Sequence, residues 1–256
     1  ILNVNQLFIK ILEIKNDLID LWTQINWNPS HMKKRYIEWV ENLKWDWCIS
    51  RQRYFWIPIP IWYSKITWEI ILPNEDQLPI NPLTTKPSIL PKWHTYEDIY
   101  WETDVLDTWA TSSLTPLINS NFFEEINLND KILPIDLRPQ AHDIIRTWAL
   151  YTIIMSYYHT WKIPFKNIMI SWHVLAWKWE KISKSKNNAW ITPEELIQKY
   201  WADPVRYWAC WWSLWKDIVF DEKEIQDWQR LITKLFNASK LVNIHLSWFK
   251  KQNLIN

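Results

Sequence analysis

Residues 167–190 read NIMISWHVLAWKWEKISKSKNNAW, and the fold can be predicted outward from this stretch. The apolar run from Asn167 to Ser171 predicts a buried strand. A loop dense in lysine and serine follows it. The next residues, Thr192-Pro193-Glu194-Glu195, form a capping box with proline at the first helical position, which predicts the start of a helix. A strand, a loop and a capped helix in this order are typical of an α/β fold.

The loop itself has the composition of a phosphate site. Four lysines (178, 181, 184 and 186) and two serines (183 and 185) lie within nine residues. Ammonium groups neutralise phosphate oxygens, and hydroxyl groups donate hydrogen bonds to them. The loop could therefore wrap a polyphosphate. Charge alone leaves a second interpretation open, which is a basic loop exposed to solvent.

The flanking segments predict further elements. Apolar residues at helical spacing favour a helix over 31–43, and the alternating prolines of 57–63 favour an extended segment. Residues 73–100 are rich in proline and polar residues, which is typical of a loop or a small lobe. We expect a short buried strand over 132–137, followed by a helix that proline at 139 opens and that runs to about residue 159. Residues 203–204 (Asp-Pro) and 221–224 predict the starts of two more helices, the second long and amphipathic.

The composition contains one anomaly. The chain has 256 residues, 24 tryptophans and no glycine. Globular proteins use roughly 7% glycine, because turns and helix ends need residues with positive φ. One hypothesis explains both counts: about two thirds of the tryptophans stand where the organism inserts glycine. A codon read as glycine in the source, with UGA the expected one, would produce this pattern when it is translated as tryptophan.

The remaining composition excludes several protein classes. Lys+Arg 29 against Asp+Glu 28 gives a net charge of +1, which indicates no general affinity for nucleic acid. Two cysteines cannot form a disulfide framework or a four-cysteine zinc site. The sequence contains no run of 18 uncharged apolar residues, so it predicts no membrane-spanning helix. The first residues carry no starting methionine and no signal pattern, so we expect an internal fragment of a cytoplasmic protein.

Several blocks of sequence share a resemblance. Lys181-Ile182-Ser183-Lys184-Ser185 looks like the Lys-Met-Ser-Lys-Ser signature of class I aminoacyl-tRNA synthetases. Residues 46–55, DWCISRQRYF, resemble the block that follows the editing insertion in this family. Residues 104–113, DVLDTWATSS, and 138–148, RPQAHDIIRTW, resemble the forms found in the valyl-tRNA synthetases. The resemblance runs from about residue 25 to about residue 245.

The resemblance implies an α/β fold, namely the second half of a Rossmann-like catalytic domain with a parallel sheet. Residues 1–30 would be the tail of the editing insertion or a linker. The catalytic half would span 31–190, with its signature loop at 177–190. Helices that contact the tRNA stem would occupy 191–220, and residues 221–256 would begin an α-helical anticodon-binding bundle.

The resemblance also implies a reaction and a set of residues. Valine would be activated with ATP to valyl-adenylate and then transferred to tRNA(Val). Lys181 and Lys184 would be catalytic, because they would stabilise the charge that develops on the phosphates. The implied ATP-binding residues are Lys181, Ser183, Lys184, Ser185, His142, Asp143 and His173. The implied valine pocket contains Trp109 and Ile144.

Plainer roles remain open for some of these residues. His142 and Asp143 could instead cap a helix, and His173 could be a structural histidine. Trp109 and Ile144 could be core residues, and Arg51 and Arg53 could face the tRNA or pack inside the protein. The cofactor expected is ATP with Mg²⁺. We expect no bound zinc, because the cysteine pairs that some relatives carry near residue 64 and in the 85–100 loop are absent here.

The resemblance also sorts the tryptophans. The family usually has glycine at eight positions: Trp56, Trp172, Trp177, Trp179, Trp190, Trp201, Trp215 and Trp228. Another eight match tryptophan or another large residue: Trp27, Trp39, Trp45, Trp47, Trp62, Trp109, Trp148 and Trp208. We expect the second set to be genuine and the other 16 tryptophans to replace glycine.

Two other functions compete with this interpretation. The first is a sister enzyme for isoleucine or leucine, because the upstream residues of the amino-acid pocket are not in the chain. The second takes all 24 tryptophans literally and makes the protein a non-enzymatic module that stacks on nucleic acid or carbohydrate. We expect the synthetase to be a monomer with tRNA(Val), valine and ATP as partners and no membrane. The fragment alone is expected to be inactive, because the other signature of the class, His-Ile-Gly-His, is absent.

Overall fold

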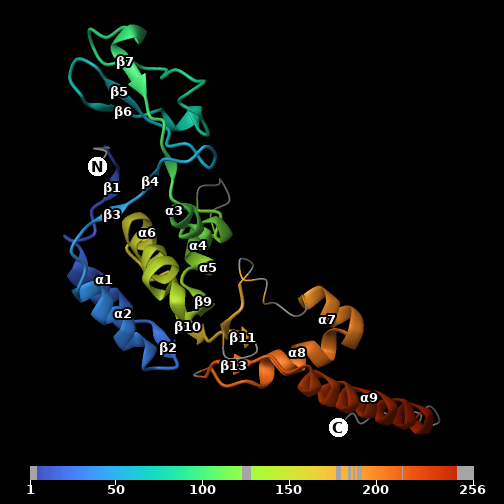
Figure 1. Cartoon of the computed structure of the whole chain (residues 1–256). Coiled ribbons are helices and arrows are strands. Elements are labelled where there is room, and N and C mark those ends of the chain that lie inside the picture. The colour runs from blue at the N-terminus through green and yellow to red at the C-terminus, as the bar shows by residue number, and fades with distance from the viewer. Residues whose placement is uncertain are drawn as a thin grey trace, which may run out of the picture. The chain divides into compact units, whose positions relative to one another are not determined.

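The computed structural model of the chain describes residues 5–122, 128–176, 180–183, 186, 188, 192–214 and 216–246. The chain divides into two compact units, Ile1–Met169 and Ile170–Asn256. Figure 1 shows the elements of both. Each unit has its own sheet and helices, and each is described by itself below.

The first unit is built on a three-stranded sheet in the order β2 (Asn26–Asn28), β10 (Phe165–Ser171) and β9 (Ile135–Ala141). Strands β2 and β10 are parallel, with Trp27 opposite Ile168. This pairing confirms the predicted strand at 167–171 and the α/β class. In this sheet, residues 26–28, which we expected in the tail of the editing insertion or in a linker, pair with the strand that precedes the signature loop.

Helices cover this sheet. They are α1 (Lys15–Thr23), α2 (Met32–Glu41), the 3-10 turn η3 (His142–Ile144), the π-helical turn η4 (Ile145–Ala149) and α6 (Leu150–Thr160). The core contains fully buried side chains from α1, α2, α6 and β10, among them Leu18, Tyr36, Ile153 and Ile168. Helix α2 buries Met32, Tyr36 and Val40, as the periodicity of 31–43 predicts.

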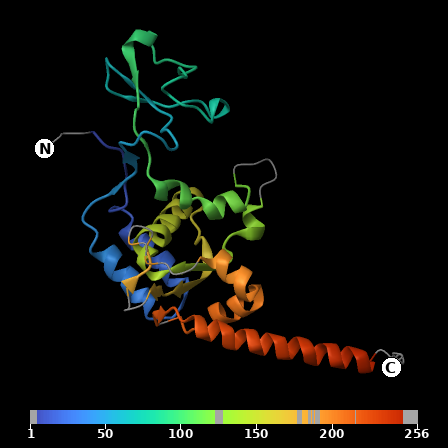
Figure 2. The same cartoon turned by 45° about the vertical axis from the view of Figure 1, so that its right-hand side comes forward.

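Shorter elements complete the first unit. The strand pairs are β1 (Phe8–Ile9) with β3 (Trp47–Cys48), and β4 (Ser50–Arg51) with β8 (Val105–Leu106). The short helices are α3 (Thr108–Ser112), α4 (Thr115–Asn119) and α5 (Asn129–Ile132). Residues 58–104 form a small lobe (Figure 2), with the sheet β6 (Ile70–Ile71), β5 (Trp62–Ser64), β7 (Ile99–Trp101) and the turns η1 (Glu75–Gln77) and η2 (Tyr96–Asp98). The lobe predicted over 73–100 is therefore present, with a β-sheet that the prolines did not reveal.

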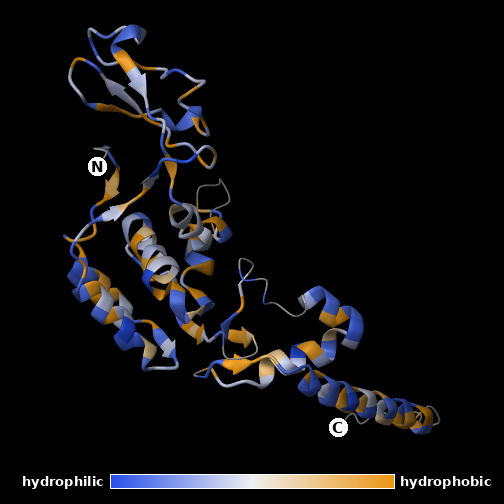
Figure 3. Ribbon diagram, in the orientation of Figure 1, coloured by the Kyte–Doolittle hydropathy of each residue, from blue (hydrophilic) through white to orange (hydrophobic). Residues whose placement is uncertain are grey.

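In the part of it that the structure describes, the second unit combines a small sheet with three helices. Its strands are β12 (Glu180–Lys181), β11 (Val174–Ala176) and β13 (Ile218–Val219), with β11 antiparallel to β12 and parallel to β13. The helices are α7 (Pro193–Tyr200), α8 (Ala202–Trp211) and α9 (Glu222–Leu246). Leu196, Tyr200, Trp208 and Ile225 form its buried core. Figure 3 shows hydrophobic and hydrophilic residues alternating along α9, as predicted for an amphipathic helix.

Two predicted elements are present with different starting points. The segment expected as a strand over 132–137 is the end of α5 followed by β9, which begins at Ile135. Pro139, expected to open a helix, lies inside β9, and the helical turns begin at His142. Strand β9 is an edge of its sheet among the described residues. A proline is tolerated there because an edge strand has backbone positions that need no hydrogen-bond donor.

Backbone conformation bears directly on the tryptophan anomaly. In the described part of the chain six residues other than glycine have positive φ, and five of them are tryptophans. Those five are Trp56 (154°), Trp68 (62°), Trp93 (69°), Trp161 (57°) and Trp201 (71°). None belongs to the set expected to be genuine. Trp27, Trp47, Trp62 and Trp208 from that set are instead buried.

No helix among the described residues is long and apolar enough to cross a membrane.

Candidate active site

The described part of the signature loop starts on a strand and continues into a closed turn. Lys181 ends β12 opposite Leu175 of β11. The Ser183 amide donates to Asn188 Oδ1 at 2.9 Å, and Asn188 Nδ2 donates to the Lys181 carbonyl at 3.1 Å. The Ser183 hydroxyl accepts the Lys186 amide at 3.3 Å. Asn188 therefore closes the turn at both ends, a role that the sequence did not reveal.

The predicted residues Lys184 and Ser185, like Trp177, Trp179 and Trp190, lie outside the described residues. Lys186, which is described, makes an ion pair with Glu180 at 3.7 Å between Nζ and Oε2. Both side chains are more than half exposed, so the pair adds little stability. The loop expected to begin at 177 thus contains strand β12, which pairs back onto β11.

His173 lies immediately before β11, at the junction with the C-terminal helices. Its amide donates to Asp217 Oδ1 at 3.0 Å, and its carbonyl accepts the Ile218 amide at 3.2 Å. These contacts fix the backbone of His173 to β13, two residues before Leu175, which pairs with Lys181. The structure therefore gathers His173, Lys181 and Ser183 around one small sheet in the second unit.

His142 and Asp143 form the start of η3, where β9 ends. Asp143 is exposed and His142 is half-buried. Arg35 of α2 lies beside His142, with 3.4 Å between Nη1 and Nδ1. Polar residues that follow a strand of an open α/β sheet lie where such sheets bind ligands. The sequence does not reveal that Arg35 is a neighbour of this position, because 107 residues separate it from His142.

Trp109 and Ile144 come from elements that pack together. Trp109 is on α3, which packs against η4 and α6, and Ile144 is the last residue before η4. Both side chains are half-buried. The Trp148 indole N–H donates to the Ser112 carbonyl at 3.0 Å, which ties η4 to the end of α3. The two predicted valine-pocket residues thus lie on neighbouring elements of one unit.

Arg138 is a buried cation beside these elements. Its side chain is 7% exposed, and its guanidinium lies 3.8 Å from the Trp148 ring centroid and 5.2 Å from that of Phe165. Nη2 donates to Thr115 Oγ1 at 3.4 Å, whereas Nη1 has no partner among the described residues. Burial lowers the pKa of Arg138 to about 10. The sequence alone indicates no role for Arg138, because an arginine that stacks on aromatic rings leaves no local pattern.

Arg51 and Arg53 have different environments. Arg51 Nη2 lies 3.3 Å from Oδ2 of the buried Asp107, which also accepts the Trp47 indole N–H at 3.3 Å. Arg51 is therefore a packing residue that holds Asp107 just before α3. Arg53 is exposed.

Within the described ranges, no group of three or more His, Cys, Asp or Glu side chains could hold a metal ion. In the small lobe, the Ser64 hydroxyl lies 2.7 Å from His94 Nε2 and accepts the amides of Ile66 and Thr67. A hydrogen-bonded cluster therefore holds this turn.

Comparison with known families settles the class. The family described as tRNA synthetases class I (I, L, M and V) matches residues 1–221. The chain belongs to the class I tRNA synthetases. Similar curated class I synthetases include Valine--tRNA ligases of Ehrlichia ruminantium strain Welgevonden (49% identity, 96% of this chain, 30% of the relative), Wolbachia pipientis wMel (48%, 96%, 29%) and Rickettsia conorii (43%, 99%, 32%). The chain thus spans about a third or less of the length of these relatives.

Solved structures confirm the class I synthetase fold. A leucyl-tRNA synthetase from Agrobacterium radiobacter K84, crystallised with tRNA and LeuAMS, matches with a TM-score of 0.61 and 23% identity, over 76% of this chain and 28% of that one. A methionyl-tRNA synthetase from Mycobacterium tuberculosis, bound by methionyl-adenylate, matches with a TM-score of 0.56 and 19% identity, over 86% and 36%. The Rossmann-like fold expected from the sequence is therefore confirmed.

Proposed function

We propose that the protein containing this chain is a valine--tRNA ligase. The observation that carries the proposal is the 49% identity to a Valine--tRNA ligase over 248 residues, which include the signature segment and the blocks around Trp109 and Ile144. The relatives named above all have this activity in their names. Isoleucine and leucine enzymes are not favoured by these matches.

The proposed reaction has two steps. A carboxylate oxygen of valine attacks the α-phosphate of ATP, and pyrophosphate leaves to give valyl-adenylate. A terminal ribose hydroxyl of tRNA(Val) then attacks the valyl carbonyl, and AMP leaves. The protein supplies no nucleophile in either step. It accelerates them by aligning the reactants and by stabilising the negative charge of the phosphates.

Lys181 and Lys184 are the residues we assign to this charge. Lys181 lies at the end of β12, where the turn closed by Ser183 and Asn188 begins. An ammonium group on such a turn can approach the leaving pyrophosphate. Ser185 would donate to phosphate oxygens. His142, Asp143 and His173 would contact the nucleotide, with Mg²⁺ bound mainly through the ATP phosphates rather than by a dedicated protein site.

Trp109 and Ile144 would form part of the valine pocket. Both are apolar and half-buried, and they lie on the elements that the Trp148–Ser112 hydrogen bond joins. An apolar pocket of this kind suits a short branched side chain. We further propose that the protein is a cytoplasmic monomer without bound zinc and that residues 191–220 contact the tRNA stem. Residues 221–256 would begin the anticodon-binding bundle.

Isotope exchange between ATP and pyrophosphate tests the first step. We expect the complete protein to catalyse exchange that depends on valine, with lower kcat/KM for isoleucine, leucine and methionine. Lys184→Ala should lower kcat about 100-fold, because a charge-stabilising donor is lost from the transition state. Lys186→Ala is the matched control, because this lysine already pairs with Glu180, and it should lower kcat less than threefold. Exchange driven best by another amino acid would contradict the proposal.

A further inference from the structure

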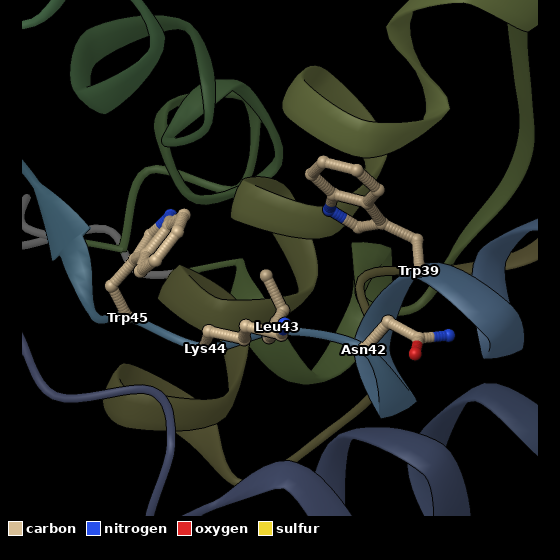
Figure 4. Close-up of a pocket in the computed structure, with 5 residues that line it drawn as sticks. All are labelled: Trp39, Asn42, Leu43, Lys44 and Trp45. Carbon is tan, nitrogen blue, oxygen red and sulfur yellow. The ribbon is translucent and has the colours of Figure 1, made fainter.

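A hollow outside the assigned residues lies between α2 and β3 in the first unit. Its volume is about 290 Å³, and Trp39, Asn42, Leu43, Lys44 and Trp45 line it. Figure 4 shows the indoles of Trp39 and Trp45 projecting to the same side of the chain with Leu43 between them. The two side chains are 38% and 72% exposed. Both belong to the set of tryptophans that we expect to be genuine.

Cations border the hollow. The Arg146 guanidinium lies 4.8 Å from the Trp39 ring centroid, and Lys44 is part of the lining. Two nearby carboxylates are engaged elsewhere: Glu38 pairs with Lys34, and Asp46 accepts two backbone amides. Glu41 is the remaining acid of the segment. The hollow therefore combines the exposed Trp45 indole with the partly exposed Trp39 indole, against whose ring Arg146 lies, and with Lys44 in its lining.

This combination fits a nucleotide. Aromatic side chains stack on unpaired bases of any sequence, and cations beside them bind the phosphates. Asn42 donates its Nδ2 to the Glu38 carbonyl at 2.7 Å, which leaves its side-chain oxygen to accept from a base edge. An apolar peptide would suit the indoles but would make no use of Lys44 and Arg146.

The position of the hollow indicates which nucleotide. Arg35 and Trp39 lie one turn apart on α2, and they contact His142 and Arg146, which also lie four residues apart. The hollow therefore adjoins the segment that we assign to the adenylate. During transfer, the terminal ribose of the tRNA must reach the adenylate, so the unpaired nucleotides before it must pass nearby.

We propose that this hollow binds an unpaired nucleotide of the tRNA acceptor end, with its base against Trp45 and Trp39 and its phosphate near Lys44 and Arg146. The inference rests on the proposed function, because it needs tRNA as the substrate. A free mononucleotide has the same chemistry, and so the test separates the two sources.

The test compares Trp45→Ala, Trp45→Phe and Lys44→Gln in the complete protein. We expect Trp45→Ala to raise the aminoacylation KM for tRNA about tenfold, because a stacking surface for one base is lost. Trp45→Phe keeps an aromatic face and should stay within about threefold. Lys44→Gln should raise the same KM and reduce its dependence on salt. Valine-dependent exchange between ATP and pyrophosphate, which needs no tRNA, should change less than twofold in all three.

Tyr96→Ala is the matched control, because Tyr96 is also an exposed aromatic with a cation, Lys86, 4.7 Å from its ring centroid, but lies in the small lobe. It should leave the KM for tRNA unchanged. An unchanged KM for tRNA in Trp45→Ala would overturn the assignment. A rise in the KM for ATP alone would also overturn it, because it would show that the hollow binds a mononucleotide. Equal losses of exchange and aminoacylation activity in the Trp45 and Lys44 variants would also contradict it, because they would show that another part of the protein, and not tRNA, packs in the hollow. If the wild-type protein shows no valine-dependent exchange, the proposed function fails instead.

Discussion

At the scale of single residues, the most informative observation is the conformation of five tryptophans. A bulky residue with φ between +57° and +154° clashes with its own backbone, and only glycine adopts this region freely. Trp201 has φ 71° and ψ 166°, a combination found almost only for glycine. Trp161 occupies the left-handed position that ends α6, where glycine is the usual residue.

Crowding gives a second sign at the same scale. Trp22, also expected to replace glycine, is fully buried, and its ring centroid lies 3.3 Å from that of Tyr36 and 4.1 Å from that of Trp27. Aromatic pairs usually keep their centroids about 4.5–7 Å apart. An indole here therefore overfills the space between α1 and α2.

The gene sequence provides the first prediction. We expect UGA at Trp56, Trp68, Trp93, Trp161 and Trp201, and UGG at Trp62, Trp109 and Trp148. Reading these codons in the source DNA is the measurement. UGG at every position would exclude the recoding hypothesis and leave the backbone strain unexplained.

Substitution gives the second prediction. Trp161→Gly and Trp201→Gly should each stabilise the protein by about 1–2 kcal/mol, because the left-handed strain is relieved and both side chains are mostly exposed. Trp62→Gly is the control, because Trp62 is 1% exposed and has no positive φ, and it should cost at least about 3–5 kcal/mol. Urea midpoints followed by circular dichroism measure the differences. A loss of stability in both Trp161→Gly and Trp201→Gly would contradict the glycine assignment.

Asp46 provides a pH-dependent prediction. Its carboxylate accepts the amides of Leu12 and Ile11, and these hydrogen bonds lower its pKa below the ordinary value. The stabilisation is therefore complete above about pH 4, the ordinary pKa of aspartate, and is lost as the pH falls through the lowered pKa. Amide hydrogen exchange should show the protection of Ile11 and Leu12 falling over that range. Asp46→Ala should lose this protection at neutral pH, and protection that persists in the variant would contradict the role of the carboxylate.

At the scale of elements, the sequence predicts best where local rules decide. The capping box at Thr192 is present: its hydroxyl accepts the Glu195 amide at 3.2 Å, and Glu195 Oε2 accepts the Thr192 amide at 2.7 Å. Helix α2 and strand β10 follow their periodic patterns in the same way. Pro139 shows where local rules fail, because its position at a sheet edge depends on strand pairing that no local pattern contains.

The N-terminal cap of α7 provides a test of these local rules. Thr192→Ala should destabilise α7 by about 1 kcal/mol, because the Glu195 amide loses its acceptor. Thr192→Ser keeps the hydroxyl and is the control. Hydrogen exchange of the α7 amides measures the effect. Equal protection in both variants would show that packing of the buried Leu196, rather than the cap, holds the first turn.

At the scale of the whole molecule, the resemblance to a known family was enough to predict the class of the protein. The spatial arrangement of the residues could be learned only from the structure. Trp109 and Ile144 could be proposed from their motifs, but the Arg138–Trp148 stack and the Arg35–His142 contact join residues from separate elements and leave no sequence signal. The compact units divide after Met169, which differs from the division after residue 190 that the resemblance implies for the functional domains; the domain boundaries after 30, 190 and 220 stay predictions. The pairing of β11 with β13 explains the difference, because it groups the signature segment with the helices that follow.

Aminoacylation by the complete protein tests the central claim most directly. Purified protein, ATP, Mg²⁺ and tRNA(Val) should be supplied with valine, isoleucine or leucine in parallel, and the charged tRNA should be counted. We predict that valyl-tRNA forms with the highest kcat/KM and that one AMP and one pyrophosphate appear for each tRNA charged. Preferential charging with isoleucine or leucine, or no charging by a folded complete protein, would contradict the claim.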